Sequence, residues 1–411
     1  MTFTRRSVVK AGAALTAATV SGVGPARANA SNTIKLGVLT DMAGPYRDLA
    51  GPNSIASVRQ AVKEFADQGF GVEVLSADHQ NKPDVASNIT RQWIDRDGVD
   101  AVVDVPGSSA SIAVAGVVRE RNKVFLASGP STAELTGSQC SPNTVHWAYD
   151  TYMLANSTGA AVVGGGGDTW FFVTADYAFG HSMEAETSRV VQGAGGKVLG
   201  SVRFPFPGTT DFSSFLVRAQ ASRAKVIGLA AGGGDLVSAV KQAAEFGLTR
   251  GGAKLAALIM FITEVHSLGL ETTQGLVCSE AFYWDLNDRT RAFSGRLKSG
   301  FGVQAPTMVH AGCYASALHY FKAVKDMGVA AAKASGVEAV NRMKAMPTED
   351  DAFGAGTIRP DGRKLHPAHL FEVKAPRESR APWDYYKLVQ TTPGERAFRP
   401  LAEGGCALGR T

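Results

Sequence analysis

The chain has 411 residues, 45% of them hydrophobic, and a formal net charge of +5. This length exceeds what one hydrophobic core usually fills, so two domains are expected. Four basic residues, Arg5, Arg6, Lys10 and Arg27, lie in the first 30 positions, which contain no acidic residue. The rest of the chain is therefore nearly neutral and has no basic stripe, which excludes nucleic acid as an expected partner.

The first 30 residues have the features of an export signal. Residues 4–10 (TRRSVVK) contain a twin-arginine pair, residues 11–23 form a run of small apolar residues, and residues 28–30 (ANA) resemble a cleavage site. The apolar run is shorter than the roughly 20 residues that span a membrane, which favours a cleaved signal over an anchor. We therefore predict a twin-arginine signal peptide at 1–30 and a periplasmic mature protein.

After the signal, short apolar runs alternate with helical patterns. Residues 34–39 and 72–75 predict strands. Between them, apolar side chains recur at helical spacing at Val58, Ala61, Val62 and Phe65. This alternation of strand and helix predicts a doubly wound α/β domain.

Two Ser/Gly-rich turns follow the next two predicted strands. The strand at 101–105 leads into Ser108 and Ser109, and the strand at 123–127 leads into the turn at 128–132. Right-handed crossovers bring the carboxyl ends of parallel strands to one edge, where ligands bind in open α/β sheets. Ser109 is expected to cap a helix whose free N–H groups attract a small carboxylate. The alternative, that the serines only cap helices, remains open.

The strand–helix pattern restarts after residues 149–151. Its expected strands are at 169–174, 198–204, 226–231 and 255–260. Residues 276–279 are interpreted as the return to the first domain, which would also hold a helix at 309–327. The end of the chain, 357–390, is expected to be rich in β-structure, with a turn at Asp361 and Gly362.

The four cysteines show no metal-binding spacing. Cys140 and Cys406 lie in polar surroundings, and we expect a disulfide between them in an oxidising compartment. Cys278 and Cys313 lie in apolar runs and are expected to pack as small hydrophobic side chains. Spacing alone leaves the connectivity open.

Common catalytic and nucleotide-binding motifs are missing from the sequence. There is no GxSxG, HExxH or GxxxxGK[ST] pattern, and the glycine clusters at 164–167 and 232–234 lack GxGxxG spacing. We therefore expect a protein that is not an enzyme and holds no cofactor and no metal ion.

The order of these features resembles the periplasmic solute-binding proteins of ABC importers, in the type I group that binds leucine, isoleucine and valine. The resemblance runs along the whole mature chain. The segments that carry it are 34–46 (IKLGVLTDMAGPY), 104–111 (DVPGSSAS), 127–136 (ASGPSTAELT), 174–180 (TADYAFG), 209–216 (TTDFSSFL), 240–248 (VKQAAEFGL) and 361–374 (DGRKLHPAHLFEVK).

This resemblance implies two Rossmann-like lobes joined by three crossovers, near residues 150–151, 277–279 and 354–356. The N-terminal lobe would contain 31–151 and 279–355, and the C-terminal lobe 152–278 and 356–411. Such a protein closes its lobes on a solute by a hinge motion and presents it to an ABC permease at the inner membrane. It is expected to be a monomer. An exported ligand-sensing domain for a signalling partner, and an exported hydrolase, are the alternatives.

The resemblance also implies which residues contact the ligand, a small-molecule carboxylate. Two serines match the turn that holds the carboxylate, three residues match the second turn, and aromatic side chains from both lobes cover the ligand. The matching positions are Ser108, Ser109, Gly129, Pro130, Ser131, Tyr46, Tyr177 and Phe179. One of the two aromatics, Tyr177 or Phe179, could instead pack in the core.

Two further positions bear on the identity of the solute, which is left open between an aromatic acid and a branched or aromatic amino acid. Gly232 stands where an aromatic residue is expected from the resemblance, and its small size would enlarge the cleft. Glu264 falls where the family places the carboxylate that pairs with an ammonium group, and it could equally cap the next helix. A buried Glu264 would need a partner, which favours an amino acid as ligand.

Overall fold

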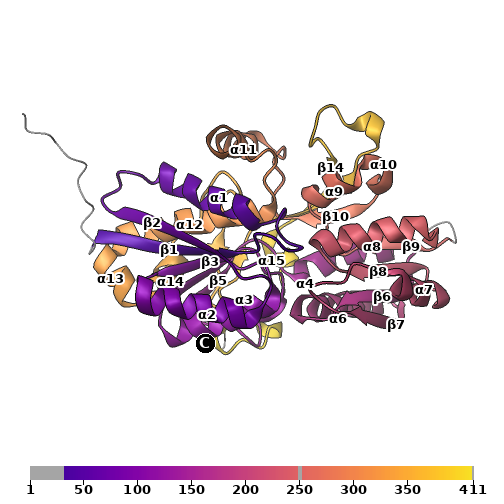
Figure 1. The fold of residues 1–411 in the computed structure, drawn as a ribbon, viewed down its shortest axis with the longest axis horizontal. Helices are drawn as coiled ribbons and strands as arrows, with labels where there is room; N and C mark the ends of the chain where they lie inside the picture. Colours follow the sequence, from indigo (N-terminus) through magenta and orange to yellow (C-terminus); the bar gives the residue numbers. More distant parts are fainter. Residues whose placement is uncertain (1–31, 249–251, 410–411) are drawn as a thin grey trace, which may run out of the picture.

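The core of the protein consists of two parallel β-sheets with helices on both faces (Figure 1). The structure, a computed structural model, describes residues 32–248 and 252–409. The predicted α/β class is therefore confirmed. The predicted signal peptide, residues 1–30, lies outside the described residues.

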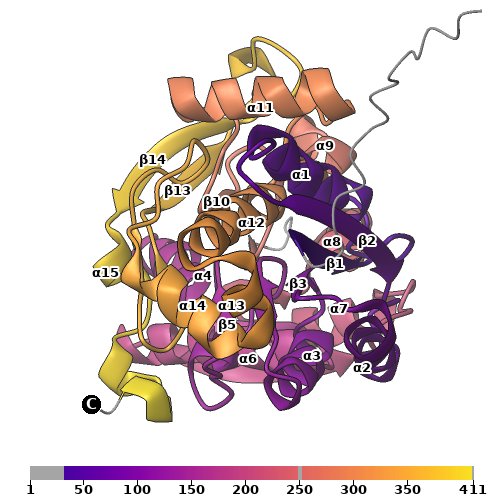
Figure 2. The same ribbon diagram turned by 90° about the vertical axis from the view of Figure 1, so that its left-hand side faces the viewer.

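The first sheet has the strand order β2-β1-β3-β4-β5 and is parallel throughout. Successive side chains of a strand face opposite sides, so Val102 packs with α2 and α3 whereas Val103 packs with α1 and α12. These two pairs of helices lie on opposite faces of the sheet (Figure 2). The elements are β1 (Thr33–Thr40), α1 (Gly51–Glu64), β2 (Gly71–Asp78), α2 (Pro83–Gln92), β3 (Ala101–Asp104), α3 (Ser108–Glu120), β4 (Val124–Ala127), β5 (Thr144–His146) and α12 (Met308–Met327).

The second sheet has the order β7-β6-β8-β9 and is also parallel. Ile227 and Leu229 of β8 pack with α7 and α8 on one face. The elements are α4 (Thr151–Leu154), α5 (Ala160–Gly164), β6 (Thr169–Ala175), α6 (Ala178–Gly193), β7 (Lys197–Phe204), α7 (Ser213–Ala221), β8 (Val226–Ala230), α8 (Gly233–Glu245), β9 (Lys254–Ala257), α9 (Ile262–Leu268) and α10 (Leu270–Thr273).

A third, antiparallel sheet of order β10-β13-β14 contains the segment interpreted as a return to the first domain. Between β10 and β13 the chain forms α11, α12, α13 and α14, and α12 packs closely against α1. The remaining elements are β10 (Val277–Glu280), α11 (Asp288–Phe301), α13 (Val329–Ala334), α14 (Gly336–Ala345), β11 (Thr357–Ile358), β12 (Lys364–Leu365), β13 (Ala368–Val373), β14 (Tyr386–Thr392) and α15 (Gly394–Ala397).

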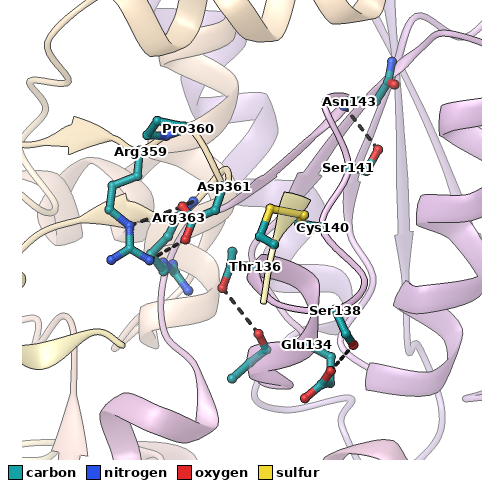
Figure 3. Close-up of a disulfide and its surroundings, with 12 residues drawn as sticks. Glu134, Thr136, Ser138, Cys140, Ser141, Asn143, Arg359, Pro360, Asp361 and Arg363 are labelled. Atoms are coloured by element: carbon teal, nitrogen blue, oxygen red, sulfur yellow. Dashed lines mark hydrogen bonds and ion pairs between the residues drawn. A yellow bond between two sulfur atoms is a disulfide. The ribbon is translucent and has the colours of Figure 1, made fainter. Parts of the chain in front are cut away.

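A disulfide joins Cys140 to Cys406, with 5.7 Å between the two Cα atoms (Figure 3). It attaches the end of the described chain to the loop that precedes β5. Arg399 supports the same attachment, because its guanidinium donates to the carbonyl of Ala133 at 2.8 Å. Cys278 and Cys313 are buried and not disulfide-bonded.

Candidate functional site

Loops at the carboxyl ends of strands from both parallel sheets line a cavity of about 250 Å³, including its open mouth. Its walls come from the loops that follow β1, β3, β4, β6, β8 and β9, and from the chain that links β5 to α4. The lining residues are Tyr46, Leu49, Pro106, Ser131, Tyr149, Tyr177, Phe179, Gly232, Ile259 and Phe261. This edge of each sheet is where α/β proteins bind ligands.

A buried carboxylate sets the position of Tyr46 in the wall. Asp41, at the end of β1, is fully buried and accepts hydrogen bonds from the backbone N–H groups of Gly44 (2.7 Å) and Tyr46 (2.8 Å). The side-chain amide of Asn81 donates to the same carboxylate at 2.5 Å. These three bonds fix the loop of residues 41–46 and hold the Tyr46 ring over the cavity.

Tyr46 meets aromatic side chains from the second sheet. Its hydroxyl is hydrogen-bonded to the hydroxyl of Tyr177, which lies between β6 and α6. The ring of Phe206 stacks on Tyr177 with 4.1 Å between centroids and on Tyr46 with 5.5 Å. Burial raises the pKa of both tyrosines, so both hydroxyls stay protonated and able to donate. Phe179, the other predicted aromatic, lies in the first turn of α6, is 2% exposed and lines the cavity.

The two serines of the first turn bind backbone groups around the cavity and do not line it. The Ser108 hydroxyl accepts from the N–H of Thr132 at 3.3 Å, which ties the first turn to the second. The Ser109 hydroxyl accepts from the N–H of Ala178 at 3.3 Å, which ties α3 to α6. The expectation that Ser109 caps α3 is wrong, because the helix begins at Ser108 with Gly107 in the capping position.

Two consecutive residues with positive φ turn the chain from β3 into α3. Asp104 has φ +83° and Val105 has φ +60°, a conformation that side chains other than glycine rarely adopt. Asp104 is fully buried, and burial raises its pKa to about 6. Strained backbone of this kind is concentrated at functional sites. Here it turns the chain into α3, whose N-terminus follows Pro106 at the edge of the cavity.

Only Ser131 of the three predicted residues of the second turn lines the cavity. A Cβ atom on Gly129 would lie 2.5 Å from the Asp104 carboxylate, so the turn packs tightly on β3. The Gly129 carbonyl accepts from the Tyr149 hydroxyl at 2.7 Å, and the Pro130 carbonyl bonds to a ring nitrogen of His146 at 2.7 Å. Within the described residues, no partner is found for the Ser131 hydroxyl, which is therefore available to a ligand.

Gly232 lines the cavity, and the space beside it is shared with Tyr46. A Cβ atom on Gly232 would lie 3.8 Å from the Tyr46 ring. The next glycine, Gly233, has φ +62°, and a Cβ there would lie 2.1 Å from the carbonyl oxygen of Pro45. That same oxygen accepts from the N–H of Gly234 at 2.9 Å. The glycines therefore let the 41–46 loop approach α8.

Glu264 is buried, and its carboxylate is occupied by backbone groups. One oxygen accepts from the N–H of Gly233 at 2.9 Å, and the other accepts from the N–H of Phe261 at 2.7 Å. The side chain is part of a capping box at the start of α9. Burial raises its pKa to about 7, and it lies outside the walls of the cavity.

This raised pKa gives a pH prediction for stability. The native state keeps the Glu264 proton up to about pH 7, whereas the unfolded chain loses it near pH 4.3. The contribution of Glu264 to the free energy of unfolding is therefore complete below pH 4.3 and falls as pH rises toward 7. Relative to Glu264→Gln, the wild-type protein should lose up to about 1.4 kcal/mol per pH unit in that window.

Urea unfolding at half-unit steps between pH 4.5 and 7.5 measures this difference. The exposed Glu245, at the end of α8, provides a control, because Glu245→Gln should leave the pH profile unchanged. Parallel profiles for the wild type and Glu264→Gln would contradict the prediction.

A model of the family described as "Periplasmic binding protein" matches residues 33–379. The chain belongs to this family. Its members are the solute-binding components of ABC transporters, which bind small molecules in the periplasm and work with membrane permeases. No helix among residues 32–248 and 252–409 combines the length and apolarity needed to cross a membrane.

Solved structures of periplasmic binding proteins share the fold over nearly the whole chain. One from Burkholderia mallei is 45% identical, with a TM-score of 0.88, and the match covers 92% of this chain and 99% of that one. A branched-chain amino acid ABC transporter periplasmic ligand-binding protein from Burkholderia xenovorans is 37% identical, with a TM-score of 0.79 and coverage of 92% and 100%. No curated protein is significantly similar in sequence.

A more distant structure, an ABC transporter solute-binding protein from Rhodopseudomonas palustris in complex with benzoate, shares the type I periplasmic binding protein fold. It is 18% identical, with a TM-score of 0.79 and coverage of 91% and 99%.

Five residues of this periplasmic binding protein line the cavity without having been singled out from the sequence. They are Leu49, Pro106, Tyr149, Ile259 and Phe261. A signal existed for two of them, since Pro106 and Phe261 follow predicted strands at the ligand-binding edge. Tyr149 follows β5, a strand of three residues, which is too short to show a period in the sequence.

Proposed function

We propose that the protein captures a small aromatic carboxylate in this cavity and delivers it to an ABC permease at the inner membrane. The observation that carries the proposal is the chemistry of the walls, which combine aromatic rings with hydroxyl groups and contain no Lys, Arg, Asp or Glu side chain. Aromatic rings stack favourably on an aromatic ligand. A ligand with a separate ammonium group finds no carboxylate in these walls.

The N-terminus of α3 and the Ser131 hydroxyl are the groups we assign to the ligand carboxylate. The first N–H groups of a helix have no partner within the helix, and they carry partial positive charge. Helix α3 has 13 residues and begins two residues after Pro106, which lines the cavity. Hydroxyl and N–H donors hold a single negative charge without a cationic side chain.

Hinged closure of two lobes is part of the proposal, with 31–151 and 279–355 as one lobe and 152–278 and 356–411 as the other. Three contacts support it. They are the Pro45–Gly234 backbone bond, the Tyr46–Tyr177 hydroxyl pair and the Ser109–Ala178 bond. Each joins a residue of the first proposed lobe to a residue of the second, so each would form on closure. We further propose that the protein is exported by the twin-arginine route and acts as a monomer.

An amino acid is the second candidate, and one observation favours it. Glu280, at the end of β10, is 2% exposed, and one of its carboxylate oxygens has no hydrogen-bond partner in the described part of the chain. Burial raises the pKa of Glu280, and burial together with a smaller contribution from Glu280 raises the pKa of Tyr149, a wall residue. An ammonium group that reached this carboxylate would stabilise its ionised form.

Calorimetric titration with benzoate, 4-hydroxybenzoate, phenylalanine and leucine separates the two candidates. We expect heat from the two aromatic acids and none from leucine. Benzamide is the matched control, because it keeps the ring and lacks the charge, and it should bind at least tenfold more weakly than benzoate. If heat is released only with leucine or phenylalanine, the ligand is an amino acid and not an aromatic acid.

A further inference from the structure

A second cavity, separate from the first, lies between α11 and the segment that links β13 to β14. Both elements lie at the top of Figure 2. The cavity encloses about 860 Å³ including its open mouth, and it shares no wall residue with the cavity described above. Its walls include two indole rings, two cationic side chains and two uncharged polar groups, from Trp284, Trp383, Arg291, Lys298, Ser294 and Gln304.

The indole of Trp383 forms a rigid wall of this cavity. Its ring stacks on the His266 ring, with 3.9 Å between centroids and 16° between planes. Its backbone has φ +71°, which is rare for a bulky side chain. The Trp383 carbonyl accepts from the Trp284 indole N–H at 2.8 Å and from the Tyr283 hydroxyl at 3.3 Å. Strained residues held in place by their surroundings concentrate at binding sites.

The polar groups on the opposite wall favour an anion. Lys298 forms no ion pair with any residue that the structure describes, whereas Arg291 is paired with Asp285 at 2.9 Å and Asp288 at 2.6 Å. Ser294 is only 4% exposed, and its buried hydroxyl has no hydrogen-bond partner in the described chain. An unpaired buried hydroxyl is costly unless a bound molecule or water satisfies it.

We propose that this cavity is a second binding site, which takes an aromatic carboxylate. The aromatic ring packs on the indoles of Trp284 and Trp383, and the carboxylate is held by the Lys298 ammonium group and, after rotation of its side chain, by the Ser294 hydroxyl. Two fixed indole faces beside an unpaired cation match the two parts of such a ligand in shape and charge.

Fluorine NMR of protein labelled with 5-fluorotryptophan tests this site, with indole-3-acetate as the probe. The signals of Trp284 and Trp383 are assigned from the Trp284→Phe and Trp383→Phe variants. We expect both signals to shift saturably with indole-3-acetate, and at least tenfold weaker binding of the neutral indole-3-acetamide. Lys298→Glu should weaken binding of the acid at least tenfold. Lys241→Glu, the same charge change at an exposed position of α8, should leave it unchanged.

Two outcomes would overturn the inference. One is that neither signal moves with the acid at millimolar concentration. The other is that Lys298→Glu titrates like Lys241→Glu, which would mean that the signals respond to binding elsewhere. The calorimetric series described above, repeated with the Lys298→Glu protein, reports on the first cavity separately. Loss of one result therefore leaves the other in place.

Discussion

Replacing Arg363 by methionine will lower the free energy of unfolding by about 3–5 kcal/mol. Arg363 is fully buried beside Asp150, which is 2% exposed. Its guanidinium donates to the Tyr149 carbonyl at 3.1 Å and to the Asp150 carboxylate at 3.3 Å, and it lies 4.5 Å from the centre of the Phe398 ring. Methionine fills similar volume but leaves the Asp150 carboxylate buried without its cation.

The pair lies where two connecting segments of the chain meet. Asp150 caps α4 by accepting from the N–H of Met153 at 2.8 Å, at the point where the chain passes from the first sheet to the second. Arg363 precedes β12, and the N–H of His146 donates to the neighbouring Gly362 carbonyl at 2.9 Å. The pair therefore fastens two connecting segments together.

Urea unfolding of the wild type and three variants measures the effect. The exposed pair of Lys225 and Asp168, with 2.7 Å between its charged atoms, provides the control. Lys225→Met should leave the unfolding midpoint unchanged, because exposed ion pairs contribute little. The double variant Arg363→Met with Asp150→Asn should recover part of the loss. Equal midpoints for Arg363→Met and Lys225→Met would refute the prediction.

Most of the parallel strands were predictable because they are apolar runs between turn residues. The runs at 101–105 and 123–127 correspond to β3 and β4, and the helix expected at 309–327 is α12 within one residue. The strand β5 was not found, because three residues are too few to show a period. The segment at 276–279 is a strand, but its partner β13 lies about ninety residues later. A local sequence pattern does not indicate which distant segments pair.

The candidate site was also partly predictable, because its walls come from turns that follow these strands. Turns after parallel strands meet at one edge, and that rule brings Ser131 to the cavity wall, whereas Tyr177 and Gly232, which also line it, were implied by the family resemblance. The rule does not say which side chain of a turn faces the cavity. Ser108 illustrates this limit, because its hydroxyl binds the Thr132 N–H inside the protein. Contacts between loops, such as that of Tyr46 with Phe206, depend on tertiary packing that no local pattern encodes.

The second large effect is expected at Gly233, where alanine should weaken binding of the preferred acid at least tenfold, or about 1.4 kcal/mol. A Cβ atom there would lie 2.1 Å from the Pro45 carbonyl oxygen, much closer than real contacts allow. The 41–46 loop would have to move away, and the Tyr46 ring would leave the cavity wall with it. Because this contact joins loops of the two sheets, the clash arises in the closed arrangement.

Gly234 supplies a matched control one residue away. A Cβ atom on Gly234 would lie 3.6 Å from the Pro45 Cα atom, which is ordinary van der Waals contact, so Gly234→Ala should bind the acid like the wild type. Calorimetry gives the affinities, and small-angle X-ray scattering with saturating acid gives the degree of closure. The Gly233→Ala protein should keep a larger radius of gyration than Gly234→Ala at saturation. If the two variants instead bind and contract alike, approach of the Pro45 loop to α8 is not part of ligand capture, and the cavity must be closed by other contacts.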